Sequence, residues 1–114
     1  MDHINQGEPM EKGQMFKPEI EVEYQDNGIV SKRILENAVG GITIFAFDKA
    51  QRLSEHTAPF DATIQVIEGK GEILINGKSN ILERGQMIVM PANIPHAVNA
   101  IEKFKMMLIM IKGN

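Results

Sequence analysis

Histidine is the residue type in this chain best suited to carry chemistry, and it occurs at His3, His56 and His96. An imidazole ring binds transition metals through a ring nitrogen, or it exchanges protons near neutral pH. His3 lies among polar residues at the start of the chain, and we expect it to be solvated. His56 precedes a predicted strand, and His96 follows the proline-bracketed segment 91–95. The two rings can act together only if the fold brings them to one place.

The composition of the chain argues against several other kinds of functional site. The chain of 114 residues has no cysteine, which excludes a disulfide framework, a thiolate metal site and a cysteine nucleophile. There is no Gly-x-Ser-x-Gly nucleophile motif, and the glycines are spaced as turns rather than as a phosphate-binding loop. A net charge of −3 argues against a nucleic-acid partner. No apolar run approaches the ~20 residues of a membrane span, and the first residues lack a signal-peptide pattern, so we expect a cytoplasmic protein without a membrane partner.

The hydrophobic pattern predicts short strands. Apolar and polar residues alternate over 20–24 and 62–66, segments 29–35 and 42–47 are also interpreted as strands, and shorter apolar runs follow at 73–75, 81–82 and 87–90. Turn signals separate them at Asp26-Asn27-Gly28, Gly40-Gly41, 68–71, Asn76-Gly77 and 83–85. Strands with turn signals about every 8–12 residues indicate a β-sandwich or a β-barrel. Segment 96–112 fits both helical and strand spacing, and its β context favours strands with a break near Glu102-Lys103.

The length fits one domain, and we divide it into an N-terminal arm, flexible or docking, at 1–15 and a barrel domain at 16–114. Segments 42–47, 87–90 and 106–111 are apolar on both strand faces, so each needs a second cover. Another subunit is one such cover, which predicts a homodimer. A second sheet or the N-terminal arm could instead supply the cover.

Residues 50–100 resemble the two motifs of the cupin superfamily. The first motif is Gly, five residues, His-x-His, three or four residues, Glu, six residues and Gly; the second is Gly, five residues, Pro-x-Gly, two residues, His, three residues and Asn. The matching positions are His56, Gly69, Gly85, Pro91 and His96. The resemblance implies an all-β fold of the cupin type, a double-stranded β-helix or jelly-roll barrel in one domain.

The departures from the motifs bear on the ligand set. Metal-binding cupins hold an ion with three His and one Glu, donors that suit Fe, Mn, Ni, Zn or Cu. By position, His56 and His96 are two of these ligands, whereas Ala58 and Ala62 replace the other two. A methyl group has no lone pair to donate, so half of the implied ligand set is missing.

Three further departures concern the backbone. Asn93 replaces a glycine and tolerates a left-handed conformation. Asn99 precedes the expected Asn position by one and would face the other side of a regular strand. Ala50 replaces a glycine, which is costly only where φ is positive.

Three interpretations of His56 and His96 stay open. They can bind a divalent metal, Fe, Mn, Ni or Zn, with water, substrate or a nearby carboxylate of Glu55 or Asp61 completing the shell. They can act as hydrogen-bonding or acid–base groups of a metal-free pocket that binds or senses a small molecule. They can also be remnants that pack inside a structural dimer module without chemistry. Neither the substrate nor the reaction is predicted, and catalysis itself stays open.

Methionines crowd the second half of the chain at Met87, Met90, Met106, Met107 and Met110. Methionine is flexible and polarizable, and it lines adaptable apolar surfaces. A run at strand spacing is typical of core packing. It also fits an apolar pocket for a small organic ligand in the mouth of a barrel.

Overall fold

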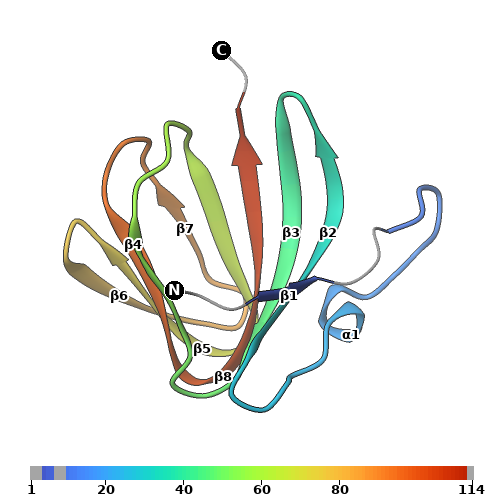
Figure 1. The fold of residues 1–114 in the computed structure, drawn as a ribbon, viewed down its shortest axis with the longest axis horizontal. Helices are drawn as coiled ribbons and strands as arrows, with labels where there is room; N and C mark the ends of the chain where they lie inside the picture. The colour runs from blue at the N-terminus through green and yellow to red at the C-terminus, as the bar shows by residue number, and fades with distance from the viewer. Residues whose placement is uncertain (1–3, 7–9, 113–114) are drawn as a thin grey trace.

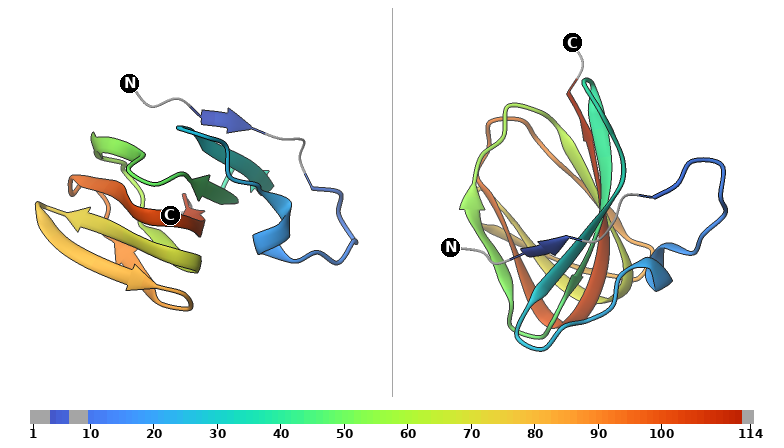
Figure 2. Two further views of the ribbon diagram at one scale, coloured as in Figure 1. Left: turned by 90° about the horizontal axis from the view of Figure 1, so that it is seen from below. Right: turned by 45° about the vertical axis from the view of Figure 1, so that its right-hand side comes forward.

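Eight strands and one short helix make up the part of the chain that the computed structural model describes, residues 4–6 and 10–112. The strands are β1 (Ile4–Gln6), β2 (Ile29–Asn37), β3 (Gly40–Phe47), β4 (Arg52–His56), β5 (Ala62–Ile75), β6 (Lys78–Glu83), β7 (Met87–Met90) and β8 (His96–Ile111), and the helix is α1 (Pro18–Glu21). They form one sheet that rolls up on itself (Figures 1 and 2). The predicted all-β fold is confirmed.

The two longest strands, β5 and β8, pair antiparallel from Ala62↔Met110 to Ile75↔His96. Both strands pass from one layer to the other. The first half of β5 pairs with β7 and its second half with β6, while the start of β8 pairs with β4 and its end with β3. One layer therefore has the order β1-β2-β3-β8-β5-β7, and the facing layer has the order β4-β8-β5-β6. Inner side chains from both layers meet in the core.

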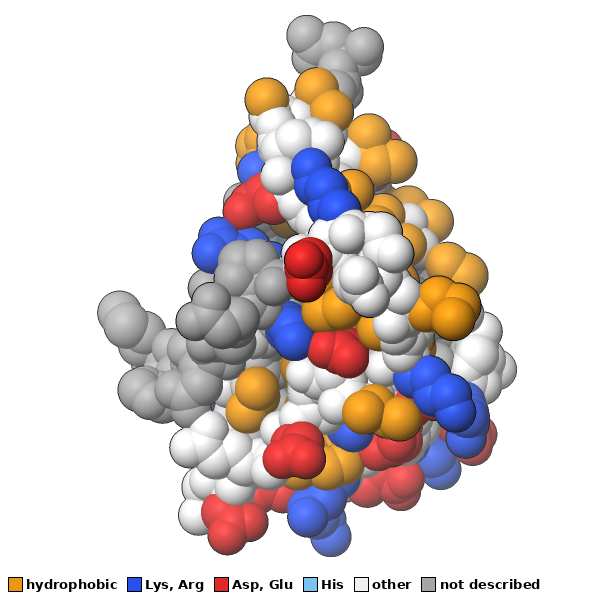
Figure 3. Space-filling view, turned by 90° about the vertical axis from the view of Figure 1, so that its right-hand side faces the viewer, with side chains coloured by type: hydrophobic (Ala, Val, Ile, Leu, Met, Phe, Trp, Pro, Cys, Tyr) orange, Lys and Arg blue, Asp and Glu red, His pale blue; other side chains and the backbone are white. Residues whose placement is uncertain are grey.

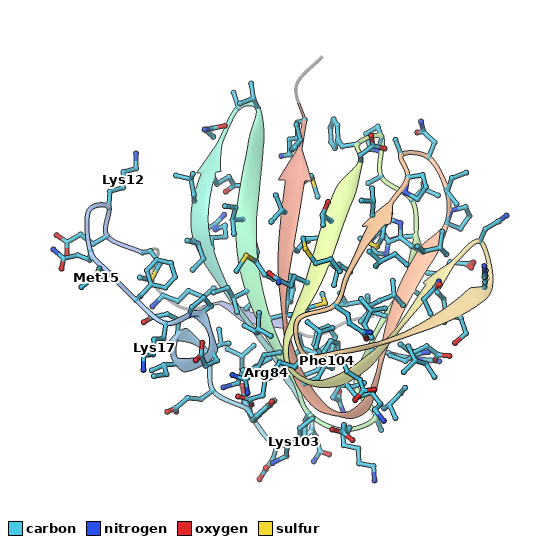
Figure 4. All side chains as sticks on the ribbon, turned by 180° about the vertical axis from the view of Figure 1, so that it is seen from behind. Lys12, Met15, Lys17, Arg84, Lys103 and Phe104 are labelled. Carbon is cyan, nitrogen blue, oxygen red and sulfur yellow. The ribbon has the colours of Figure 1, made fainter. Side chains whose placement is uncertain are left out.

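Glycines allow the two strands to bend where they change layer. The β5–β8 register shifts on both sides of Gly69, which has a φ of 77°. A Cβ on Gly69 would collide with the carbonyl of Lys103, and a Cβ on Gly71 would lie 2.6 Å from the ring of Phe104. That ring stacks on Phe47 with centroids 4.6 Å apart, at the end where the strands converge (Figure 4). The predicted turn at 68–71 is therefore wrong, because these glycines permit a close approach between strands rather than a chain reversal.

The predicted break near Glu102-Lys103 is also wrong. β8 continues through these residues, and the exposed segment 101–103 has no partner on β5 because the register shifts there. The other strand predictions from Ile29 onward are confirmed with small changes of boundary. The expectation that His56 only precedes a strand is wrong, because His56 is the last residue of β4, a strand that the hydrophobic pattern did not predict. Asn76-Gly77 forms the hairpin between β5 and β6 as expected, whereas β3 begins at Gly40, so the preceding turn lies at 38–39 rather than at Gly40-Gly41.

The predicted strand at 20–24 is wrong as well. Pro18 starts the single turn of α1, and Val22 inserts against Ile44 and Ala46 on the outer face of β3. We call residues 17–24 the strap. The turn at Asp26-Asn27-Gly28 is present, but it leads from the strap into β2 instead of joining two strands.

Polar contacts fasten the strap to the barrel. Lys105, 8% exposed, donates to the carbonyl of Glu19 over 2.6 Å. Tyr24 donates to Glu68 over 2.6 Å, and Lys32 pairs with Glu21 over 2.8 Å. The strap therefore covers one part of the outer face of β3.

The N-terminal arm at 1–15 stays a prediction. Within it, β1 pairs in parallel with β2, while residues 1–3 and 7–9 lie outside the described part. No helix among the described residues is long and apolar enough to cross a membrane.

Ala50 provides a test of backbone strain. Its φ is 71°, and its N–H donates to the carbonyl of Ala100 over 2.9 Å. Because a side chain in this left-handed region costs about 1 kcal/mol, we expect Ala50→Gly to raise the free energy of unfolding by about that amount in urea titrations. Ala38→Gly, at an exposed turn position without positive φ, is the control and should not stabilise. An Ala50→Gly variant no more stable than the parent would contradict this account.

Candidate functional site

Neighbouring strands place the two predicted site histidines side by side. His56, at the end of β4, lies opposite His96, at the start of β8. The two Nε2 atoms are 3.2 Å apart, and the ring planes meet at 69°. His96 is buried, with 7% of its surface exposed, whereas His56 is exposed. The third histidine, His3, lies outside the described residues.

Backbone carbonyls fix the orientation of both rings. The Nδ1 atom of His56 lies 2.7 Å from the carbonyl oxygen of Ser54, and that of His96 lies 3.2 Å from the carbonyl oxygen of Ile94. A carbonyl oxygen only accepts hydrogen bonds, so each Nδ1 carries the hydrogen. In a neutral ring the Nε2 atom then presents a lone pair.

With both hydrogens on Nδ1, the two Nε2 atoms lie 3.2 Å apart without a hydrogen between them. Two such nitrogen atoms repel unless a proton, a hydrogen-bond donor or a metal ion lies between them. Burial, with a further contribution from His56, lowers the pKa of His96, although its bond to Ile94 opposes the shift. Near neutral pH the ring of His96 is therefore uncharged, and its Nε2 atom is a hydrogen-bond acceptor beside His56.

The segment before β8 places His96 in the wall of a cavity. Asn93 has a φ of 65°, as expected for its left-handed turn, and its N–H donates to the carbonyl of Ala58 over 2.7 Å. Val98, which lies two residues after His96 on β8, lines the same cavity as the histidines. Asn99 points the other way, where it donates to Glu72 over 3.0 Å. The predicted change of face at Asn99 is confirmed.

The cavity behind the histidines is apolar. Its volume is about 60 Å³. Small and aliphatic side chains form much of its wall, namely Leu53, Ala58, Ala62, Ile64, Val98 and Leu108. Three methionines, Met90, Met106 and Met110, complete it. The methionines on the inner face thus line a pocket. Their spacing in the sequence was compatible with a pocket but did not distinguish it from core packing.

Carboxylates do not complete a metal shell here. Asp61 accepts a hydrogen bond from the N–H of Ala92 over 2.8 Å, and Glu55 is exposed and lines a separate groove with Arg52. Among the described residues, no cluster of three His, Cys, Asp or Glu side chains could hold an ion. A shell of three histidines and one glutamate therefore does not fit this chain.

A site with two protein ligands does fit the geometry. Two nitrogens at 2.0–2.1 Å from one tetrahedral ion lie about 3.3–3.4 Å apart, close to the observed 3.2 Å. Metal-ligating histidines usually donate their other ring N–H to a carbonyl or carboxylate, as both rings do here. The sequence analysis did not identify the carbonyls of Ser54 and Ile94 as partners of the two rings, because every residue has a carbonyl. The available signal was their shared position, two residues before each histidine.

The lowered pKa of His96 predicts a pH dependence of stability in the metal-free protein. The unfolded chain takes up a proton on this ring near pH 6.5, above the folded pKa, so the contribution to stability is complete above pH 6.5 and is lost as pH falls through the folded pKa. We expect the free energy of unfolding to fall more steeply between pH 7 and 5 in the parent than in His96→Gln. Equal slopes in urea titrations with a chelator present would argue against a neutral, buried His96.

Comparison with known proteins places this fold and site in a family. The family model described as a cupin domain matches residues 43–112. A conserved protein of unknown function from Streptococcus pyogenes is 34% identical, with 92% of each chain covered and a TM-score of 0.86. A cupin 2 conserved barrel domain protein from Leptotrichia buccalis is 43% identical and has a TM-score of 0.80; the match covers 82% of this chain and 46% of that one.

An RmlC-like cupin from Desulfovibrio desulfuricans is 28% identical over 80% of this chain and 89% of that chain, with a TM-score of 0.72. No curated protein matches the chain. The family model spans more than half of the sequence and includes both histidines. The chain belongs to the cupin family.

Proposed function

We propose that this cupin binds a transition-metal ion between His56 and His96 and a small, mostly apolar organic molecule in the adjoining cavity. The observation that carries the proposal is the approach of two Nε2 atoms to 3.2 Å, with each Nδ1 hydrogen held by a backbone carbonyl. This arrangement orients both rings before any ligand arrives, so little conformational freedom remains to be lost on binding.

The cavity supports the organic ligand. Its wall is apolar, and the two imidazoles supply the polar groups that orient a ligand. The cavity is small, but methionine side chains have three rotatable bonds and adapt to a guest. A compact molecule with an apolar body and one oxygen or nitrogen atom facing the histidines matches this lining.

A bound ion would supply Lewis acidity or activate oxygen beside the cavity. The protein's own residues would hold the ion from one side, because among the described residues only the two histidines offer nitrogen donors in the cavity wall. An organic molecule or water would then complete the shell on the cavity side. The proposal includes catalysis only as the chemistry that a bound ion would supply.

A metal-free binding or sensing module is the second candidate, favoured by Ala58 and Ala62 in the cavity wall. A ligand with a hydrogen-bond donor would then occupy the position between the two Nε2 atoms. We propose the cytoplasm as the location, since no cysteine is present to form a disulfide in an oxidising compartment.

Metal analysis tests the leading proposal. Protein purified without chelator, or reloaded with Mn, Fe, Ni, Zn or copper, should contain an equimolar amount of one ion. His56→Ala and His96→Ala should each lose it, because each removes one of two nitrogen donors. Asn99→Ala, on the opposite face of β8, is the matched control and should retain it.

Absence of every ion from the parent protein would remove the metal from the proposal. The metal-free candidate would then be tested with a library of small apolar molecules on chelator-treated protein. A ligand at 100 times its Kd should add ~2.7 kcal/mol of stability.

We also propose that two copies pair through the outer face of the larger layer. The register places Val89, Thr63 and Ile109 in one row across β7, β5 and β8, and Met87, Gln65 and Met107 in the next. Val89 and Met87 are 58% and 53% exposed, and neither row carries a charge. The strap reaches only Ile44 and Ala46 among the buried residues of β3. Hydrophobic side chains follow one edge of the molecule in Figure 3, while charged ones gather at its lower end.

Light scattering should therefore report a dimer. Val89→Lys should shift it to the monomer, because two copies of the new charge would be desolvated in the interface. Ile81→Lys is the control, since Ile81 is similarly exposed at 56% but lies on the outer face of the other layer. A parent protein that is monomeric at high concentration would rule out this pairing.

A further inference from the structure

We infer that the ion selected by this centre is copper(I), with the thioether of Met90 or Met110 from the cavity wall joining His56 and His96 as a ligand. The inference rests on the proposed metal site and specifies its ion and a third donor. Three observations lead to it: the charge of the site, the chemistry of its wall and the position of two methionines.

The charge of the site favours a monovalent ion. The donors that face the cavity are neutral imidazoles, and Ala62 stands where the family resemblance implies a carboxylate. A divalent ion would therefore keep its full charge beside an apolar wall. The cost of placing a charge in a medium of low polarity rises with the square of the charge, so a monovalent ion is much less penalised.

The chemistry of the wall favours a soft ion. Divalent Mn, Fe, Ni and Zn need further nitrogen, oxygen or thiolate donors, and the described residues provide no third such side chain at the site. The wall instead contains the thioether sulfurs of Met90, Met106 and Met110. Thioether donors select copper(I), and imidazole also binds copper.

Two of these methionines flank the position of the missing carboxylate. Ala62 on β5 pairs with Met90 on β7 and with Met110 on β8. Residues directly opposite one another on antiparallel strands point to the same face, so both methionines project into the cavity beside the Ala62 methyl. Ala62 leaves space there, and the flexible thioether chains can use it.

Successive side chains on a strand point to opposite faces of the sheet, so outward-facing methionines on the same strands supply matched controls. Met87 lies on β7 with Met90 but faces outward, and Met107 lies on β8 between the inward-facing Met106 and Met110. A change of methionine to leucine conserves volume and is usually tolerated in a core. Inner and outer Met→Leu variants therefore differ in whether they remove a sulfur atom from the cavity.

The experiment titrates the metal-free protein of residues 1–114 with copper(I) under anaerobic reducing conditions against a chromogenic copper(I) chelator. Zinc(II) and manganese(II) are titrated separately. We expect equimolar copper(I) binding that neither divalent ion displaces, and a sulfur scatterer beside nitrogen in the X-ray absorption spectrum of the copper-loaded protein. The double variant Met90→Leu/Met110→Leu should lose that sulfur signal and bind copper(I) about tenfold or more weakly. Met87→Leu/Met107→Leu should match the parent, and circular dichroism should show both variants folded.

Failure of this inference is distinguishable from failure of the proposed function. Equimolar zinc or manganese that depends on both histidines and is not displaced by copper(I) would overturn the copper assignment and leave the metal site in place. Copper(I) bound with nitrogen alone, or equally well by the double variant, would overturn the thioether ligand. A parent protein that binds none of the three ions would overturn the copper assignment, and failure to bind iron and nickel as well would remove the metal from the proposed function.

Discussion

The antiparallel pairing of β5 with β8 is the constraint on which the barrel and its site depend. Because both strands bend and change layer, one strand contributes to two walls of the same cavity. The start of β8 supplies His96 and Val98, and its other half supplies Met106 and Met110. Residues far apart along one strand can face each other in this way only if the strand curves. Gly69 and Gly71 permit that curvature by leaving room for the backbone of β8 and the ring of Phe104.

The site combines a rigid rim with an adaptable interior. At the rim, the two rings are held by pairing between β4 and β8 and by carbonyls two residues earlier in the chain. Inside, Ala58 and Ala62 stand where the family resemblance implies two further ligands, and three methionines complete the wall. The two imidazole nitrogens therefore approach one another beside an apolar cavity.

The sequence was most informative where the signal was local. Asn76-Gly77 specified a hairpin because both residues adopt positive φ, and alternation or short apolar runs marked the strands from Ile29 onward except β4. The resemblance to cupins identified His56 and His96 as one site before their contact was known. The alternation at 20–24 misled because Val22 is buried by packing on β3 while the chain makes a helical turn. The glycines at 68–71 misled because a close approach between strands has the same composition as a turn. Ring orientation was not predictable, since it depends on backbone carbonyls.

The strap has a consequence for how the chain can be divided. Its contacts join Lys105 and Glu68, in the middle of the β5–β8 ladder, to residues near the other end of the sequence. The matched family segment begins only at residue 43, so a recombinant fragment drawn from that boundary would omit the strap, β2 and the start of β3. Such a fragment would expose the apolar outer surface of β3 and leave the Lys105 amine without its carbonyl acceptor. The minimal folding unit of this protein is therefore longer than its family signature.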